Sequence, residues 1–170
     1  MLAEELSGFY LEWAWNDGRD HFPNELFTGD TPASGFLKHS AATHIQNITP
    51  KEVGSIIDPS HRAEIKLLQQ VSPHALITTN YDTFLERMFA DYAPIIGETV
   101  LRASYASIGE ILKIHGCVSN PSSMVLTDSD YAQFAIKRKH LSAKLLTYFA
   151  EHPLLFVGYS ASDPNIAMAQ

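Results

Sequence analysis

Residues 75–82 read Ala75-Leu76-Ile77-Thr78-Thr79-Asn80-Tyr81-Asp82, a short apolar run followed by a polar tail. The apolar run is rich in residues that favour β-structure, and an amphipathic stretch begins directly after it at Thr83. This profile predicts a buried strand that leads through a polar loop into the N-terminus of a helix. The expected fold class is therefore α/β, with an open parallel sheet.

Two further apolar runs end in the same way. Ile111-Leu112-Lys113-Ile114 is followed by His115-Gly116, and Leu154-Leu155-Phe156-Val157 is followed by Gly158-Tyr159-Ser160. Ligands of open parallel sheets bind beyond the carboxyl ends of the strands. We therefore expect the three polar loops to share one crevice.

Residues 1–74 form a mainly helical region in this prediction, packed on or inserted in the same domain. Residues 2–15 have amphipathic helical spacing, and residues 17–40 are expected to be irregular and anchored by aromatic side chains, or to form very short helices. Helix starts are predicted at Thr49-Pro50 and at Asp58-Pro59, because each pair combines a capping side chain with proline at the first helical position.

Residues 75–170 form the predicted core. Besides the three strands it is expected to hold a strand near residues 98–102, a helix capped by Asp128 or Ser129, and a longer helix that carries Leu141 to Phe149. A last helix would begin at Asp163-Pro164. We expect this core to be incomplete at both ends and to belong to a longer protein.

Composition narrows the class of protein. The 170 residues are 45% hydrophobic and 18% charged, which is ordinary for one globular domain. No apolar run reaches the about 20 residues that cross a bilayer, and the first five residues are acidic where a signal peptide is basic. A formal charge of −7 argues against nucleic acid as the main partner. The single cysteine, Cys117, favours a reducing cytoplasm and argues against a zinc site built from cysteines.

Asn80 and Asp82 each allow two interpretations. Both residue types are preferred helix N-caps, so either could simply begin the helix after the first strand. Alternatively, a helix N-terminus and a fixed amide suit a polar or anionic ligand.

The polar residues after the other two apolar runs also allow two interpretations each. His115 could act as a general base near neutral pH, with Gly116 leaving room for a substrate, or it could be a structural histidine. Gly158 and Ser160 could hold ribose or phosphate oxygens, or form a plain turn. The remaining seven histidines show no metal-ligand spacing.

The strand-end motifs resemble those of the sirtuin-like domains of bacterial anti-phage defence proteins. The matching segments, within about residues 75–166, are Thr78–Asp82, Lys113–Gly116, Met124–Thr127 with Asp130-Tyr131, and Val157–Asn165. The resemblance implies a Rossmann-like sheet with helices on both faces, and NAD as the ligand. It implies Asn80 and His115 as the catalytic pair. It also implies cofactor-binding residues: Asp82 on the nicotinamide side, Gly158 and Ser160 at the adenosine half, and in addition Thr79, Gly116 and Asp163.

Two departures from the family pattern refine the expected function. No four-cysteine zinc module follows His115, which favours hydrolysis of NAD without a metal over peptide deacetylation. The sequence contains no Gly-x-Gly, so the family's pyrophosphate-binding loop lies outside this chain or is lost. We expect a cytoplasmic NAD+ glycohydrolase that acts as the effector of a homo-oligomeric defence protein with further domains or subunits. The alternatives are an NAD or ADP-ribose sensor without turnover, and a protein deacylase or ADP-ribosyl transferase.

Overall fold

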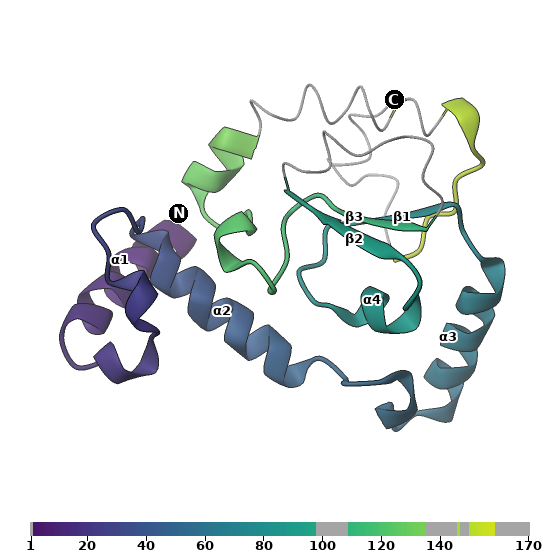
Figure 1. The fold of residues 1–170 in the computed structure, drawn as a ribbon, viewed down its shortest axis with the longest axis horizontal. Coiled ribbons are helices and arrows are strands. Elements are labelled where there is room, and N and C mark those ends of the chain that lie inside the picture. Colours follow the sequence, from purple (N-terminus) through teal and green to yellow (C-terminus); the bar gives the residue numbers. More distant parts are fainter. Residues whose placement is uncertain (1, 98–108, 135–145, 147–149, 159–170) are drawn as a thin grey trace.

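The structure is a computed structural model that describes residues 2–97, 109–134, 146 and 150–158. Within these residues, helices lead into a three-stranded parallel sheet (Figure 1). The helices are α1 (Leu2–Trp15), α2 (Ser34–Ile48), α3 (Pro59–Val71) and α4 (Phe84–Met88), with 3₁₀ turns η1 (Arg19–His21), η2 (Asn24–Leu26), η3 (Val53–Ser55) and η5 (Pro121–Ser123). The strands are β1 (Ala75–Thr78), β2 (Ala93–Ile96) and β3 (Glu110–Lys113). The predicted α/β class with a parallel sheet after a mainly helical region is confirmed.

β3 lies at the centre of the sheet, in the order β1-β3-β2. All four of its residues are buried, as expected for a strand paired on both sides. Thr78 of β1 and Ile96 of β2 are both register partners of Lys113. The carboxyl ends of β1 and β3 therefore lie side by side, and the loops that follow them leave the sheet at the same edge.

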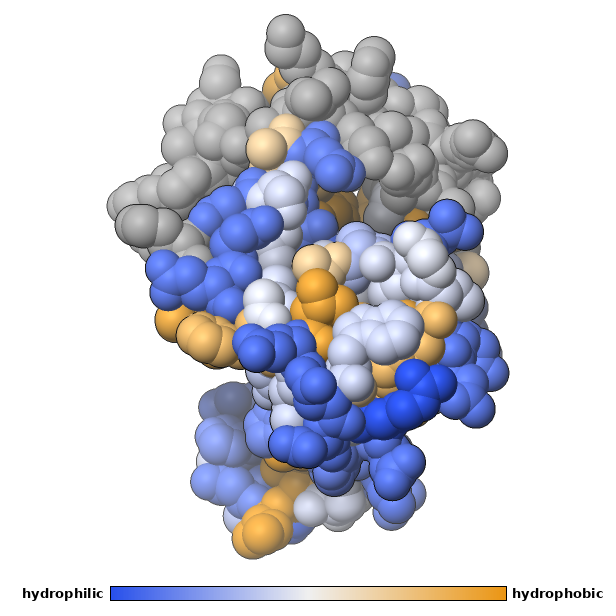
Figure 2. All heavy atoms as spheres, turned by 90° about the vertical axis from the view of Figure 1, so that its left-hand side faces the viewer, coloured by the Kyte–Doolittle hydropathy of each residue, from blue (hydrophilic) through white to orange (hydrophobic). Residues whose placement is uncertain are grey.

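An aromatic cluster joins α1, α2 and the turns between them. Phe22 and Phe36 are buried with Ala14, and the two phenyl rings meet edge to face at a centroid distance of 5.2 Å. The predicted aromatic anchoring of this region is confirmed, although α2 already begins at Ser34. Figure 2 shows this end of the molecule, where apolar side chains lie among hydrophilic ones. None of the described helices is long and apolar enough to cross a membrane.

Of the two predicted helix starts in this region, one is confirmed and one is wrong. Asp58 caps α3, because its Oδ1 accepts a hydrogen bond from the amide of Ser60 at 2.8 Å and Pro59 occupies the first helical position. The hydroxyl and amide of Ser60 hold the pKa of the Asp58 carboxyl below its usual value. Thr49 instead ends α2, since both its amide and its hydroxyl donate to the carbonyl of Ile45. A residue before proline is disfavoured in helical conformation, so Thr49-Pro50 acts here as a stop.

The predicted strand at residues 154–157 does not form. These residues form no regular secondary structure and lie outside the described sheet, and their side chains are exposed, with Phe156 51% exposed. An apolar run indicates β-structure without specifying a partner strand. The strand near 98–102, most of the helix over 141–149 and the helix from Asp163 lie outside the described residues.

Candidate functional site

The loop after β1 is shaped by two local hydrogen bonds. The amide of Asn80 donates to Oγ1 of Thr78 at 3.0 Å, and Oδ1 of Asp82 accepts from the amide of Phe84 at 2.8 Å. Asp82 therefore bonds to the first residue of α4, although the N-cap position itself is occupied by Thr83. The side chain of Asn80 is exposed between these two anchors.

His115 occupies the matching position after β3. Thr78 and Lys113 are register partners, and Asn80 and His115 each follow by two residues. The imidazole is buried, with 5% exposure, and its ring lies edge-on to Phe134 at a centroid distance of 4.9 Å. The strand register thus brings the expected catalytic pair to the same edge of the sheet, with the histidine held in an aromatic setting.

Gly116 has a structural reason to be glycine. Its φ is +91°, and a Cβ at this position would lie 2.2 Å from the carbonyl oxygen of Ser123 and 2.8 Å from Cα of Met124. The close approach that this glycine permits is therefore that of the protein's own backbone. The amide of Val125 then donates to the carbonyl of His115 at 3.0 Å, which closes the loop.

Tyr81 joins the loops that follow β1 and β3. Its carbonyl accepts from the amide of Val118 at 2.9 Å, and its hydroxyl donates to the carbonyl of Val125. Burial, together with Tyr131 and Asp130 nearby, raises the pKa of Tyr81 to about 12. The phenol therefore stays protonated as a hydrogen-bond donor, and the two loops form one unit.

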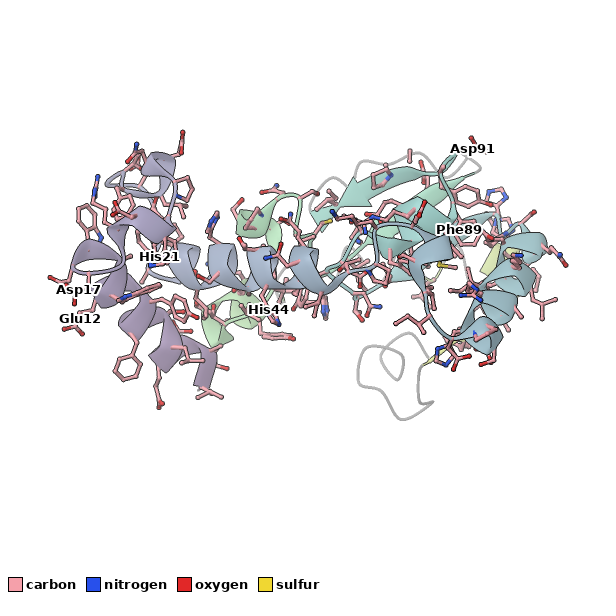
Figure 3. The ribbon with its side chains drawn as sticks, turned by 90° about the horizontal axis from the view of Figure 1, so that it is seen from below. Glu12, Asp17, His21, His44, Phe89 and Asp91 are labelled. Atoms are coloured by element: carbon pink, nitrogen blue, oxygen red, sulfur yellow. The ribbon has the colours of Figure 1, made fainter. Side chains whose placement is uncertain are left out.

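Helix α2 packs on this unit from the side of the helical region. Gln46 Nε2 donates to the carbonyl of Val118 at 3.0 Å, and Ala42 packs against Val118 and Met124. Figure 3 shows α2 running between the end that holds His21 and the part of the molecule that holds Phe89.

An open pocket of about 320 Å³ lies where α2 meets the loop after β1. Its lining residues are Ile45, Thr79, Asn80, Tyr81 and Asp82. Ile45 gives the pocket an apolar wall, opposite a polar loop. The sequence does not reveal this role, because helical periodicity marks the apolar face of α2 without naming what it faces.

Residues 128–134 are also helical and contact His115 through the rings of Tyr131 and Phe134, and a reciprocal capping arrangement fixes the start of this helix. The amide of Asp130 donates to Oγ1 of Thr127, and Oδ2 of Asp130 accepts from the amides of Thr127 and Leu126. The cap is thus Thr127, and the prediction of Asp128 or Ser129 is wrong, because the motif needs hydroxyl and carboxylate three residues apart.

The same carboxylate binds α2. Lys38 Nζ lies 2.6 Å from Oδ1 of Asp130, and both side chains are largely buried. Burial raises the pKa of Asp130, but the hydrogen bonds from Lys38, Thr127 and Leu126 outweigh it and leave the pKa below its usual value. Helix α2 is therefore tied both to the loop after β3 and to the helix that packs on His115.

The other predicted site residues are placed as follows. Thr79, Asn80 and Asp82 line the pocket, whereas His115 lies at the neighbouring strand end and does not line it. Gly158 is exposed with φ +72°, and Ser160 and Asp163 lie outside the described residues. Among the residues that the structure describes, no three His, Cys, Asp or Glu side chains gather in a metal-binding group.

Comparison with known proteins identifies relatives. The family model of the SIR2-like domain matches residues 74–169. The chain is 31% identical over 106 residues to "NAD(+) hydrolase ThsA" of Bacillus cereus (strain MSX-D12), covering 59% of this chain and 22% of that protein. It is 27% identical over 124 residues to "Defense-associated sirtuin 2" of Bacillus subtilis, covering 69% and 12%. A ThsA of Cytobacillus dafuensis is 26% identical over 106 residues, covering 59% and 22%. These matches confirm the resemblance that the strand-end motifs predict.

Proposed function

Because the chain belongs to the SIR2-like domain family, we propose that it hydrolyses NAD+ to nicotinamide and ADP-ribose. The observation that carries this proposal is the placement of Asn80 and His115 two residues beyond paired positions of adjacent parallel strands. Two relatives bear the name NAD(+) hydrolase, which supports the same reaction here. The chain spans 12% to 22% of the length of the relatives it matches, so the activity is proposed for the protein that contains it.

The reaction itself sets what the site must do. Water adds to the anomeric carbon of the ribose while the bond to nicotinamide breaks, giving ADP-ribose, neutral nicotinamide and a proton. Nicotinamide leaves as a neutral molecule and therefore needs no protonation, while positive charge develops on the sugar. The protein has to hold the nicotinamide and ribose, place the water and support the developing charge.

The described residues suit these tasks. The side-chain carboxamide of Asn80 both donates and accepts hydrogen bonds, so it can orient the water or a ribose hydroxyl. His115 can accept a proton from the water or a ribose hydroxyl as a general base. The pocket offers the apolar side chain of Ile45 to the face of a flat ring and the polar residues Thr79 and Asp82 to its carboxamide. We infer that Gly158, Ser160 and Asp163 complete the binding of the dinucleotide, whereas Gly116, packed against the backbone of Ser123, shapes the loop after β3.

Release of nicotinamide by the complete protein tests the proposal. Asn80→Ala and His115→Ala are each expected to lower the rate by about 10²- to 10⁴-fold, because each removes a group that acts in the transition state. Asn24→Ala and His61→Ala are controls that remove exposed residues of the same two types outside the pocket and the two loops, and they should retain the wild-type rate. Wild-type turnover in the Asn80 or His115 variant would remove the assignment.

A sensor that binds NAD or ADP-ribose without turnover is the second candidate. Two observations favour it: the sequence has no Gly-x-Gly, and His115 does not line the pocket. Calorimetric binding of NAD by the complete protein, with no nicotinamide released, would select this function.

We further propose that the protein acts in the cytoplasm in anti-phage defence. The name of the Bacillus subtilis relative supports the defence role, and the short coverage of all three relatives supports additional domains or subunits. A homo-oligomer is part of this proposal, and light scattering of the complete protein would test it. Loss of cellular NAD on phage infection, absent in the Asn80→Ala strain, is the expected result in cells.

A further inference from the structure

We propose that Lys113 is a positioning residue, which holds the loop of residues 79–83 in place beside His115. Lys113 is the last residue of β3, the central strand, and its side chain is completely buried. Lysine is almost never fully buried unless its ammonium is paired, because that group loses its hydration. The groups that pair with the Lys113 ammonium therefore indicate which part of the fold this side chain holds in place.

Both partners of the ammonium belong to the segment that follows β1. Nζ donates to the main-chain carbonyl of Asp82 and lies 3.2 Å from Oε1 of Glu86 on α4. A side chain of β3 thus holds the loop and the helix that follow its neighbouring strand. The sequence contains the signal, since Lys113 is the charged residue inside the apolar run before His115, but the partner is not visible there.

Besides the bonds of Tyr81 to Val118 and Val125, two further anchors of this loop lie on either side of Asn80. On one side, its amide is bonded to Thr78, the last residue of β1. On the other side, the carbonyl of Asp82 is bonded to Lys113. The carbonyl of Thr78 accepts from the amide of Ile114, and the carbonyl of Tyr81 accepts from the amide of Val118, so Lys113 adds a side-chain link at Asp82, beyond these main-chain bonds. Without the ammonium, the end of the loop at Asp82 loses its bond to β3, the strand that leads to His115.

A purely structural role makes a different prediction from a positioning role. Removing Lys113 alone leaves Glu86 without its ion-pair partner, which destabilises the fold whatever the lysine does for the site. The double variant Lys113→Met with Glu86→Gln removes both charges and keeps the approximate shape. A structural role predicts that this variant regains both stability and activity. A positioning role predicts that stability returns and activity does not, because methionine cannot donate to Asp82.

The experiment compares the complete protein with the double variant, with Lys113→Arg and with Lys66→Met, the last being an exposed lysine on α3. The activity readout rests on the proposed NAD hydrolysis. In the double variant we expect kcat to fall about 100-fold with little change in KM, because a misplaced catalytic group slows the chemical step. Lys113→Arg keeps a donor and should recover part of the loss, while Lys66→Met should match the wild type.

Hydrogen exchange of the amides of residues 79–83 supplies a readout that needs no turnover. Faster exchange in this loop of the double variant, at an unchanged melting temperature, is the expected result. If the wild type releases no nicotinamide, the proposed hydrolysis fails and loop exchange alone decides on Lys113. Unchanged exchange in the double variant, or a wild-type kcat there, would overturn the positioning role.

Discussion

Replacing Gly116 by alanine should destabilise the protein strongly. The added Cβ would lie 2.2 Å from the carbonyl oxygen of Ser123 and 2.5 Å from its carbon, and neither backbone atom can rotate away as a side chain would. The φ of +91° costs an L-residue about 1–2 kcal/mol, and the overlap costs about 1–3 kcal/mol as overpacking. The free energy of unfolding should therefore fall by about 2–5 kcal/mol, a large part of the about 5–15 kcal/mol of a typical domain.

Urea unfolding of the 170-residue chain, followed by far-ultraviolet circular dichroism, measures this change. With a denaturant slope of about 2 kcal/mol per molar, the midpoint should fall by about 1–2.5 M. Gly8→Ala is the matched control, because Gly8 lies on exposed α1 with nothing within 4 Å of an added Cβ, and alanine favours a helix by about 1 kcal/mol. An unchanged midpoint for Gly116→Ala would refute the role assigned to the backbone contact.

Three further variants test other parts of the site. Ile45→Trp should fill the pocket and weaken NAD binding about tenfold or more, which calorimetry measures; wild-type affinity would place the ligand elsewhere. Tyr81→Phe should lose about 1 kcal/mol near neutral pH. Since the folded pKa of Tyr81 is raised to about 12, the wild type loses stability as pH rises from about 10 towards 12, and the variant should lose less. The pKa of Asp130 is lowered in the folded protein, so the stability that its carboxylate contributes is present above about pH 4 and is lost as the pH falls through the folded pKa. The urea midpoint of Asp130→Asn should therefore vary less between about pH 5 and pH 2 than that of the wild type. Parallel plots of midpoint against pH for the two proteins would contradict this.

Local signals in the sequence predicted local structure well. Asp58-Pro59 begins α3, and two of the three apolar runs form β1 and β3, because capping and strand propensity act within a few residues. β2 was missed at 93–96. It contains Pro94, which is tolerated in an edge strand and argues against a strand in the sequence alone.

The parts of the site that depend on long-range packing were not predictable. The apolar runs predict that the polar loops meet at one edge of the sheet, but they cannot specify that β1 pairs with β3 in the register that places Asn80 and His115 at equivalent positions. Likewise, the pocket wall at Ile45 and the bond from Lys113 to Asp82 join residues more than 30 positions apart. Asp82 has both a structural and a potential ligand-binding role, since it bonds to the first residue of α4 and also lines the pocket.

The contacts of α2 bear on how this protein should be divided for expression. A chain cut at residue 74, where the family match begins, would lose the ammonium that neutralises Asp130 and the amide that satisfies the carbonyl of Val118. It would also expose Met124 to water, from which Ala42 now shields it. The family match therefore leaves out a helix that contacts the matched segment at three places, and we expect a fragment that retains α2 to be more stable than one that begins at residue 74.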